Sequence, residues 1–115
     1  MATTQDYTTI SPAAQASTAS YVIVAGSLVN TAARHTLSYT IKNTGAESID
    51  WKVVGGNLSD PSDGVIVNNV ATITAGAYGT AYNATSLPYQ WYAVYIVDTV
   101  AASHGEATLA AIAKK

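Results

Sequence analysis

Hydrophobic and polar residues alternate with a period of two in two neighbouring segments, 35–42 and 47–54. This period is typical of β-strands with one buried face. Residues 43–46 between them read Asn-Thr-Gly-Ala, which favours a turn. We therefore predict that the two segments form a β-hairpin. The residues expected to face inwards are His35, Leu37, Tyr39 and Ile41 in the first strand, and Ile49, Trp51 and Val53 in the second.

Residues 89–97 form a third strand-like segment, rich in aromatic and β-branched residues, that lacks this alternation. One side would carry Tyr92, Val94 and Ile96, and the other would carry Tyr89, Trp91, Ala93, Tyr95 and Val97. In a small sandwich only one face of a strand meets the core. We therefore expect a loop, an N-terminal arm or another molecule to cover the second face.

The rest of the chain completes an all-β pattern. Strand-like pieces occupy 21–25, 64–70, 71–74 and 77–84, separated by glycine-rich and polar turns such as 55–64. The last segment, 106–113, would pass as a helix on propensity. Its short length and its position after Gly105 favour a strand, which we predict to pair with 89–97 through a hairpin at 99–105.

These elements predict one antiparallel β-sandwich of about seven or eight strands, immunoglobulin-like or jelly-roll in type, spanning residues 21–115. Residues 1–20 are polar and small, and we expect an extended N-terminal arm anchored by Tyr7 and Ile10. The predicted core also includes Ile23 from the strand at 21–25, together with Tyr92, Val94 and Ile96.

The composition favours a protein that associates with neighbours. Hydrophobic residues make up 49% of the chain but charged residues only 10%, against about 25% in a typical domain. A surface with so few charges is poorly protected against association. A neutral secreted β domain would have the same composition, so both interpretations stay open.

Charge and targeting signals exclude several other classes. The net charge is −2, and the five cationic residues are scattered, so we expect no nucleic-acid binding. No basic and apolar leader precedes the domain and no apolar run reaches the length of a membrane span, so we expect synthesis in a cytoplasm, no signal peptide and no membrane insertion. The chain has no cysteine.

No motif indicates catalysis, a metal or a cofactor. The two histidines, His35 and His104, are far apart in the sequence and lack a companion carboxylate motif. Asn57, Asp60 and Asp63 offer oxygen ligands of the kind that Ca²⁺ takes, but their spacing fits ordinary turns better. We therefore expect no catalytic residues, no metal site, no cofactor and no enzymatic activity.

The aromatic residues are the remaining candidates for function. Tyr89, Trp91 and Tyr95 would share one strand face. Such a row could form a protein interface, where tyrosine and tryptophan are enriched, could be covered by the N-terminal arm, or could stack sugars. We predict an interface of Tyr89, Trp91, Tyr95, Tyr7 and Ile10.

Two stretches, HTLSYTIKNTGAESIDWKV (35–53) and YAVYIVDTVAASHGEATLAAIAKK (92–115), resemble small β-sandwich proteins encoded among the structural genes of tailed bacteriophages. The resemblance implies a virion component: a capsid decoration or cement protein, or else a head or tail accessory subunit.

The resulting prediction is a non-enzymatic virion protein that binds and reinforces a repeating protein shell as a homo-oligomer. The alternatives are a carbohydrate- or cell-surface-binding module and a pilus-like or shell subunit that polymerises by itself.

Overall fold

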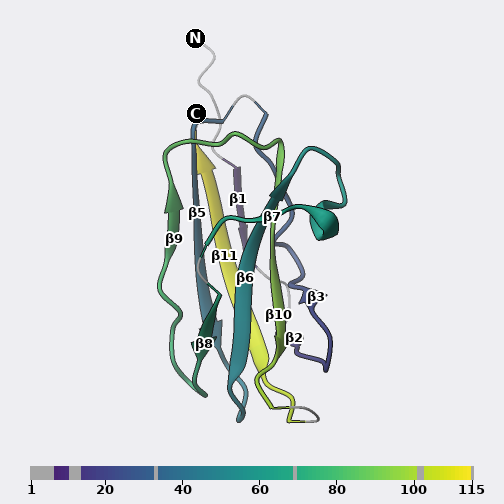
Figure 1. The fold of residues 1–115 in the computed structure, drawn as a ribbon. Coiled ribbons are helices and arrows are strands. Elements are labelled where there is room, and N and C mark those ends of the chain that lie inside the picture. The colour runs from purple at the N-terminus through teal and green to yellow at the C-terminus, as the bar shows by residue number, and fades with distance from the viewer. Residues whose placement is uncertain (1–6, 11–13, 33, 69, 101–102, 115) are drawn as a thin grey trace.

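The computed structural model describes residues 7–10, 14–32, 34–68, 70–100 and 103–114. Strands and one short 3₁₀ turn, η1, make up its regular structure (Figure 1). In chain order the elements are β1 (Tyr7–Ile10), β2 (Gln15–Ala16), β3 (Val22–Ile23), β4 (Val29–Asn30), β5 (Thr36–Asn43), β6 (Ile49–Gly56), η1 (Pro61–Asp63), β7 (Val65–Ile66), β8 (Ala71–Ile73), β9 (Tyr82–Ala84), β10 (Trp91–Asp98) and β11 (Glu106–Lys114).

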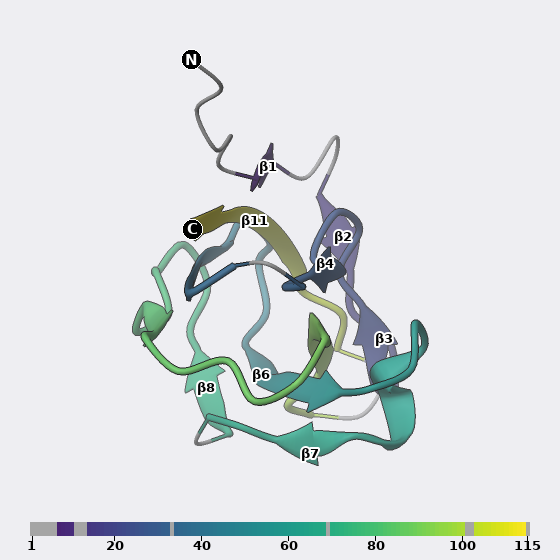
Figure 2. The same ribbon diagram turned by 90° about the horizontal axis from the view of Figure 1, so that it is seen from above.

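The strands form two antiparallel sheets that face each other. Sheet A has the order β1–β11–β5–β9, with β2 also on β11, and sheet B has the order β3–β10–β6–β7, with β4 on β10 and β8 on β6. The view from above separates the layer of β11 from the layer of β6 and β7 (Figure 2). The all-β sandwich is therefore confirmed, and 106–114 is a strand.

Six of the short strands form three pairs, and the members of each pair lie along the same side of one long strand. These pairs are β1 and β2 on β11, β3 and β4 on β10, and β7 and β8 on β6. Within the described residues the eleven segments therefore occupy eight strand positions, four in each sheet. Successive positions lie in opposite sheets except for β6 and β7, which pair directly. This is the arrangement of a jelly roll, one of the two sandwich types that the sequence left open.

The two predicted hairpins are wrong. β5 pairs with β11 and β9, whereas β6 pairs with β10, β7 and β8, so the turn at 44–48 crosses between sheets. The connection between β10 and β11 crosses in the same way. Alternation and turn residues are the same whether the returning strand pairs beside the first or packs opposite it. The local pattern therefore gives no information on this choice.

The core lies between the inner faces of the long strands. Of the predicted core, Leu37, Tyr39, Ile41, Ile49, Trp51, Val53, Tyr92, Val94 and Ile96 are buried. Two inward assignments are wrong. Ile23 pairs with Tyr95 on the outer face of sheet B and is 36% exposed. His35 precedes β5 and is exposed.

A bulge interrupts the edge between β3 and β4. Gly26 has a φ of 82°, a left-handed conformation that suits glycine. The Ser27 hydroxyl replaces missing backbone pairing, since it accepts from Val94 N at 3.0 Å and donates to Val94 O at 3.2 Å. Tyr39 also donates its hydroxyl proton to Ser27 O at 2.6 Å. The bulge carries Leu28 to the outer face, where it packs against Val54, Ala93 and Tyr95.

The described part of the predicted N-terminal arm is extended and belongs to sheet A. β1 pairs with β11 from Tyr7 opposite Ala113 to Ile10 opposite Ala110, and β2 pairs with Glu106 and Ala107. Residues 1–6 and 11–13 of the arm lie outside the described residues.

Candidate functional site

The outer face of sheet B is the surface on which the predicted interface should lie. Trp91 and Tyr95 are on this face of β10, and Trp91 is half-buried. Tyr89 precedes β10 and does not share it. Its ring packs against the core, 6.1 Å from the ring of Tyr92. The predicted row of three rings on one face is therefore not formed.

The chain itself covers the centre of this face. Val54, Ala93 and Tyr95 form a second buried cluster there, and Tyr95 is only 8% exposed. The loop of η1 packs on β6 and β10, and its Pro61 is buried. Burial, followed by the nearby carboxylates of Asp60 and Asp63, raises the pKa of Tyr95. Cover by a loop was one of the three coverings expected, and it leaves little of Tyr95 for a partner.

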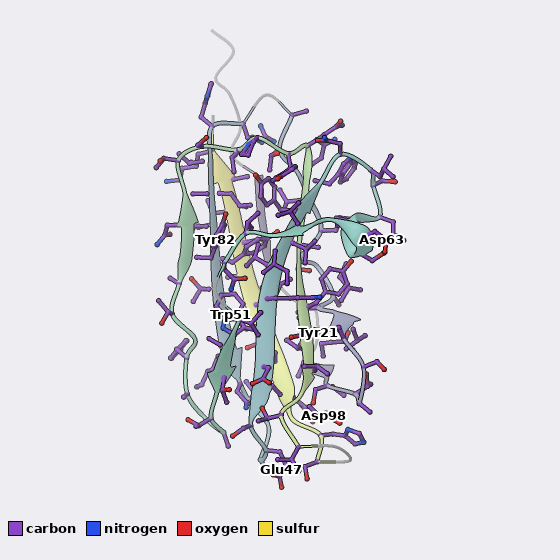
Figure 3. The ribbon with its side chains drawn as sticks, in the orientation of Figure 1. Tyr21, Glu47, Trp51, Asp63, Tyr82 and Asp98 are labelled. Atoms are coloured by element: carbon purple, nitrogen blue, oxygen red, sulfur yellow. The ribbon has the colours of Figure 1, made fainter. Side chains whose placement is uncertain are left out.

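Exposed apolar side chains remain around this covered centre. Tyr21 and Ile23 lie on the β3 side, and Ile66 of β7 lies opposite Val54 on the other side (Figure 3 labels Tyr21). We call the exposed residues Tyr21, Ile23, Leu58 and Ile66 the apolar rim; Leu58 comes from the loop before η1. Lys52 lies between the rings of Tyr21 and Tyr95, with Nζ 4.0 Å and 5.9 Å from their centroids. This cation–π contact holds the charge against the face.

The backbone places Tyr7 and Ile10 on β1, an edge strand of sheet A, whereas the apolar rim lies on the outer face of sheet B. They therefore do not join Trp91 and Tyr95 in one surface of a single chain. An interface role for the five predicted residues stays a prediction.

A polar cluster that the sequence pattern did not reveal lies at the lower end of the sandwich, where Figure 3 labels Asp98. The Asp98 side chain is fully enclosed. Ser17 Oγ donates to Asp98 Oδ1 at 2.6 Å, and His104 Nδ1 lies 2.8 Å from Asp98 Oδ2. The Gly105 amide donates to Ser17 Oγ at 2.7 Å, and the Ser17 amide donates to Gly105 O at 2.8 Å.

Serine, aspartate and histidine are the residue types of a hydrolytic triad, but their order of contact here is different. In a triad the imidazole lies between the hydroxyl and the carboxylate and takes the hydroxyl proton. Here the carboxylate of Asp98 lies between Ser17 and His104, and Ser17 is buried. The Ser17 proton therefore points to Asp98. This geometry fastens the segment after β2 to the β10–β11 connection.

This cluster gives a testable dependence on pH. Burial raises the pKa of Asp98, but hydrogen bonds from Ser17 and His104 and the charge of His104 outweigh it and lower the pKa below its ordinary value of 3.8. A carboxyl group with a lowered folded-state pKa stabilises the fold above its ordinary pKa, and this stabilisation is lost as the pH falls through the folded-state value. We expect the stability advantage of the wild type over Asp98→Asn to shrink as the pH falls below 3.8.

Urea denaturation followed by tryptophan fluorescence from neutral to acid pH measures this difference. Comparison with Asp98→Asn removes the contribution of the other carboxylates, which titrate in both proteins. An advantage that stays the same at every pH would contradict a role for the Asp98 charge.

The other candidate ligands have structural roles. Asp60 Oδ1 accepts from the Ser62 amide at 3.1 Å and caps η1, and Asn57 Oδ1 accepts from the Gln90 amide at 3.3 Å. Within the described ranges no group of three or more histidine or acidic residues is placed to hold a metal ion. The same residues include no helix of the length and hydrophobicity needed to cross a membrane.

Comparison with known proteins identifies the fold. No protein-family model and no curated protein matches the chain. Its structure is similar to YomS, a protein derived from the SPBc2 prophage, with 12% identity, a TM-score of 0.55 and coverage of 98% of this chain and 97% of YomS. It is also similar to a chain of the Bacillus endospore appendages, which form disulfide-linked pili, with 13% identity, a TM-score of 0.53 and coverage of 96% and 87%. At these identities the similarity shows a shared fold.

Proposed function

We propose that this protein is a non-enzymatic structural subunit of a virion, specifically a capsid decoration protein that binds a repeating protein shell as a homo-oligomer. The prophage-derived and pilus proteins that share its fold support a role in an assembly. The low proportion of charged residues also supports it, because such a surface offers little resistance to protein contact.

The apolar rim is the observation that carries this proposal. Tyr21, Ile23 and Ile66 are exposed on one sheet face, around a buried centre formed by Val54, Ala93 and Tyr95, on which Leu28 packs. The only charged side chains on the strands of this face are Asp50 and Lys52, and Lys52 is held against two rings. Asp50 Oδ1 is likewise occupied, since it accepts from Thr72 at 2.5 Å and Thr99 at 3.2 Å. On the strands of this face a partner would therefore meet no unpaired charge, whereas Asp60 and Asp63 are exposed in the adjoining η1 loop.

Substitution of the apolar rim tests the proposal. Ile23→Lys is expected to weaken binding to tailed-phage capsids by about tenfold or more, because the new charge would have to be desolvated within the contact. Sedimentation of the purified protein with and without capsids measures the bound fraction and the mass of the free oligomer.

Ile112→Lys is the matched control. Ile112 is 37% exposed, as Ile23 is 36% exposed, but it lies in sheet A. The Ile112→Lys variant should therefore bind capsids as the wild type does. Equal binding by both variants would refute the apolar rim as the contact surface, and failure of the wild type to bind any such capsid would refute the decoration role.

Self-polymerisation is a second candidate, favoured by the sheet edges. Residues 64–97 contain no Asp, Glu, Lys, Arg or His, and they supply β7, β8 and β9 at the edges of both sheets. Edge strands are commonly protected by charges, which are missing here. The chain has no cysteine, so a polymer would form without disulfides. Regular polymers of the purified protein in the absence of a partner would favour this candidate over decoration.

The third candidate is a sugar-binding face made by Tyr89, Trp91 and Tyr95, and the positions of these rings do not support it. Tyr89 packs on the core and Tyr95 is buried with Val54 and Ala93, so these three rings present no common platform.

A further inference from the structure

A pocket opens between the two sheets, on the side where β8 and β9 form the edges. Its volume is about 230 Å³, and it is separate from the apolar rim. Sheet B supplies Trp51 from β6, Ala71 from β8 and Asn68 from the preceding loop, and the facing wall consists of Thr80, Ala81 and Tyr82. Figure 3 shows Trp51 and Tyr82 between the same two layers.

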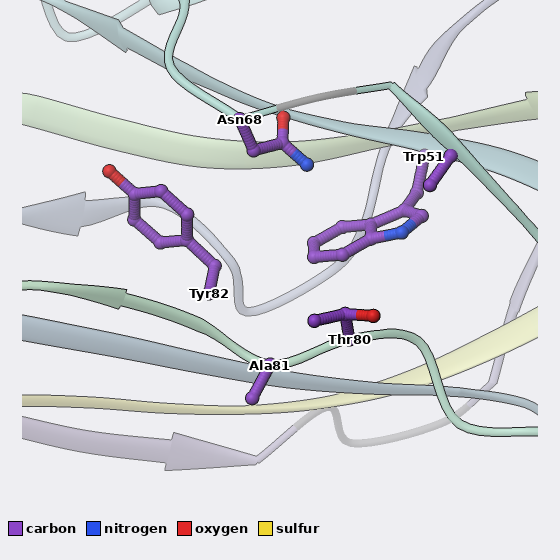
Figure 4. A pocket seen from close by; sticks show the side chains of 6 residues that line it. Trp51, Asn68, Thr80, Ala81 and Tyr82 are labelled. Carbon is purple, nitrogen blue, oxygen red and sulfur yellow. The ribbon is translucent and has the colours of Figure 1, made fainter.

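The indole of Trp51 gives this pocket an unsatisfied hydrogen-bond donor. Trp51 is 2% exposed, and its Nε1 has no hydrogen-bond partner among the described residues. Figure 4 shows the nitrogen-bearing edge of the indole turned towards the wall that carries Thr80. A buried donor without an acceptor is destabilising, and such groups are rare in folded proteins. An acceptor oxygen at this wall would remove that cost.

Asn68 supplies a second donor. Its Oδ1 accepts from the Val53 amide at 2.6 Å, which fixes the orientation of the side-chain amide. The amide NH₂ group consequently faces the space between the rings of Trp51 and Tyr82, as Figure 4 shows. The hydroxyl of Thr80 adds a group that both donates and accepts. Asn68 from sheet B and Thr80 from the facing wall therefore bring polar groups to the same pocket.

The lining defines the chemical class of a ligand. None of the six described lining residues is charged, so a neutral ligand fits best. The two aromatic rings suit the apolar face of a saturated ring, and the donors suit its oxygen atoms. Water occupies about 30 Å³ per molecule in the liquid, so the 230 Å³ of the pocket can hold a ligand of several heavy atoms but not a long chain.

We infer that this pocket binds one ring of a neutral carbohydrate, with Trp51 Nε1 and the Asn68 amide donating to its oxygen atoms and Tyr82 packing on its apolar face. The inference does not depend on the proposed function, since the apolar rim lies on a different surface. The ligand enters at Thr80 and Ala81, which are exposed and belong to no strand. Because Nε1 is enclosed, a ligand oxygen reaches it only if these two residues move outwards.

Titration of the full chain with D-glucose, D-galactose, D-mannose and N-acetyl-D-glucosamine tests this inference. Proton–nitrogen NMR follows the indole signals of Trp51 and Trp91, which Trp91→Phe assigns. We expect at least one sugar to shift the Trp51 indole signal in a saturable way and to leave the Trp91 signal unchanged. No shift with any of the four, or equal shifts of both signals, would overturn the inference.

Filling the pocket provides the variant test. Ala71→Leu and Ala71→Ile place extra atoms in the pocket from the wall of sheet B and should each weaken sugar binding by about tenfold or more. Asn83→Ala is the control, because Asn83 lies on the same strand as Tyr82 but points to the other face, where it accepts from Ser38 at 2.7 Å.

Thermal unfolding confirms that each variant is folded, and having two filling variants keeps the test valid if one is not. Undiminished binding by a folded filling variant would overturn the site. Ile23→Lys should bind sugar as the wild type does, so failure of the assembly proposal leaves this result unaffected.

Discussion

Replacing Ile96 by alanine is expected to lower the free energy of unfolding by about 2–5 kcal/mol. Ile96 lies on the inner face of β10, fully buried, with Trp51 of β6 and Val22 of β3 opposite it. Neighbours on both sides hold the backbone in place, so the structure cannot close around the missing atoms. The loss would be a large share of the roughly 5–15 kcal/mol that stabilises a domain. Urea denaturation with tryptophan fluorescence measures it.

Ile112→Ala is the matched control for this prediction. Ile112 is also in a long strand with neighbours on both sides, but its side chain is 37% exposed on the outer face of sheet A. Its truncation leaves no enclosed cavity, so a cost of about 1 kcal/mol or less is expected. Equal losses for the two variants would contradict the assignment of inner and outer faces.

Replacing Gly105 by alanine should have the second-largest effect. A Cβ atom at Gly105 would lie 2.5 Å from the backbone oxygen of Glu47 and 2.6 Å from Cγ2 of Ile49. The backbone of Gly105 cannot easily move away, because both its N–H and its C=O bond to Ser17. Overpacking of this kind costs about 1–3 kcal/mol, and occasionally more. The same denaturation measurement applies.

Gly56→Ala is the control for a change of glycine to alanine as such. A Cβ atom there would meet Pro61 at 3.4 Å, an ordinary contact. It should change the stability by a few tenths of a kcal/mol or stabilise slightly, since alanine reduces the freedom of the unfolded chain. If Gly105→Ala were equally mild, the close contact between the β10–β11 connection and the β5–β6 connection would be wrong.

Much of the fold can be predicted from local sequence patterns. Alternation in 35–42 and 47–54 correctly predicts the burial of residues such as Leu37, Tyr39 and Trp51. The hydrophobic segment 89–97 correctly predicts a strand with two covered faces. The main core covers one face of β10, and the second buried cluster lies on the other. The error at Ile23 arises because a strand of two residues is too short for its alternation to distinguish inside from outside.

The candidate sites were less predictable. Trp51 reads as a core residue in the sequence, and nothing local indicates that its indole nitrogen lacks a partner or that Asn68 and Tyr82 approach it. Ser17 and Asp98 are 81 residues apart, with no spacing that would suggest a contact. The η1 loop reads as a turn, but its packing on β6 and β10 depends on the pairing of these two distant strands.

The sequence by itself determined the all-β class, the positions of the long strands and which face of each is buried, because side-chain polarity along a strand acts locally. Only the tertiary structure decided that β5 and β6 lie in opposite sheets, that a loop covers the outer face and that an aromatic pocket opens between β8 and β9. These features depend on the pairing of strands distant in the chain. Backbone hydrogen bonds are the same for every residue, so they carry no local signal of the partner they will find.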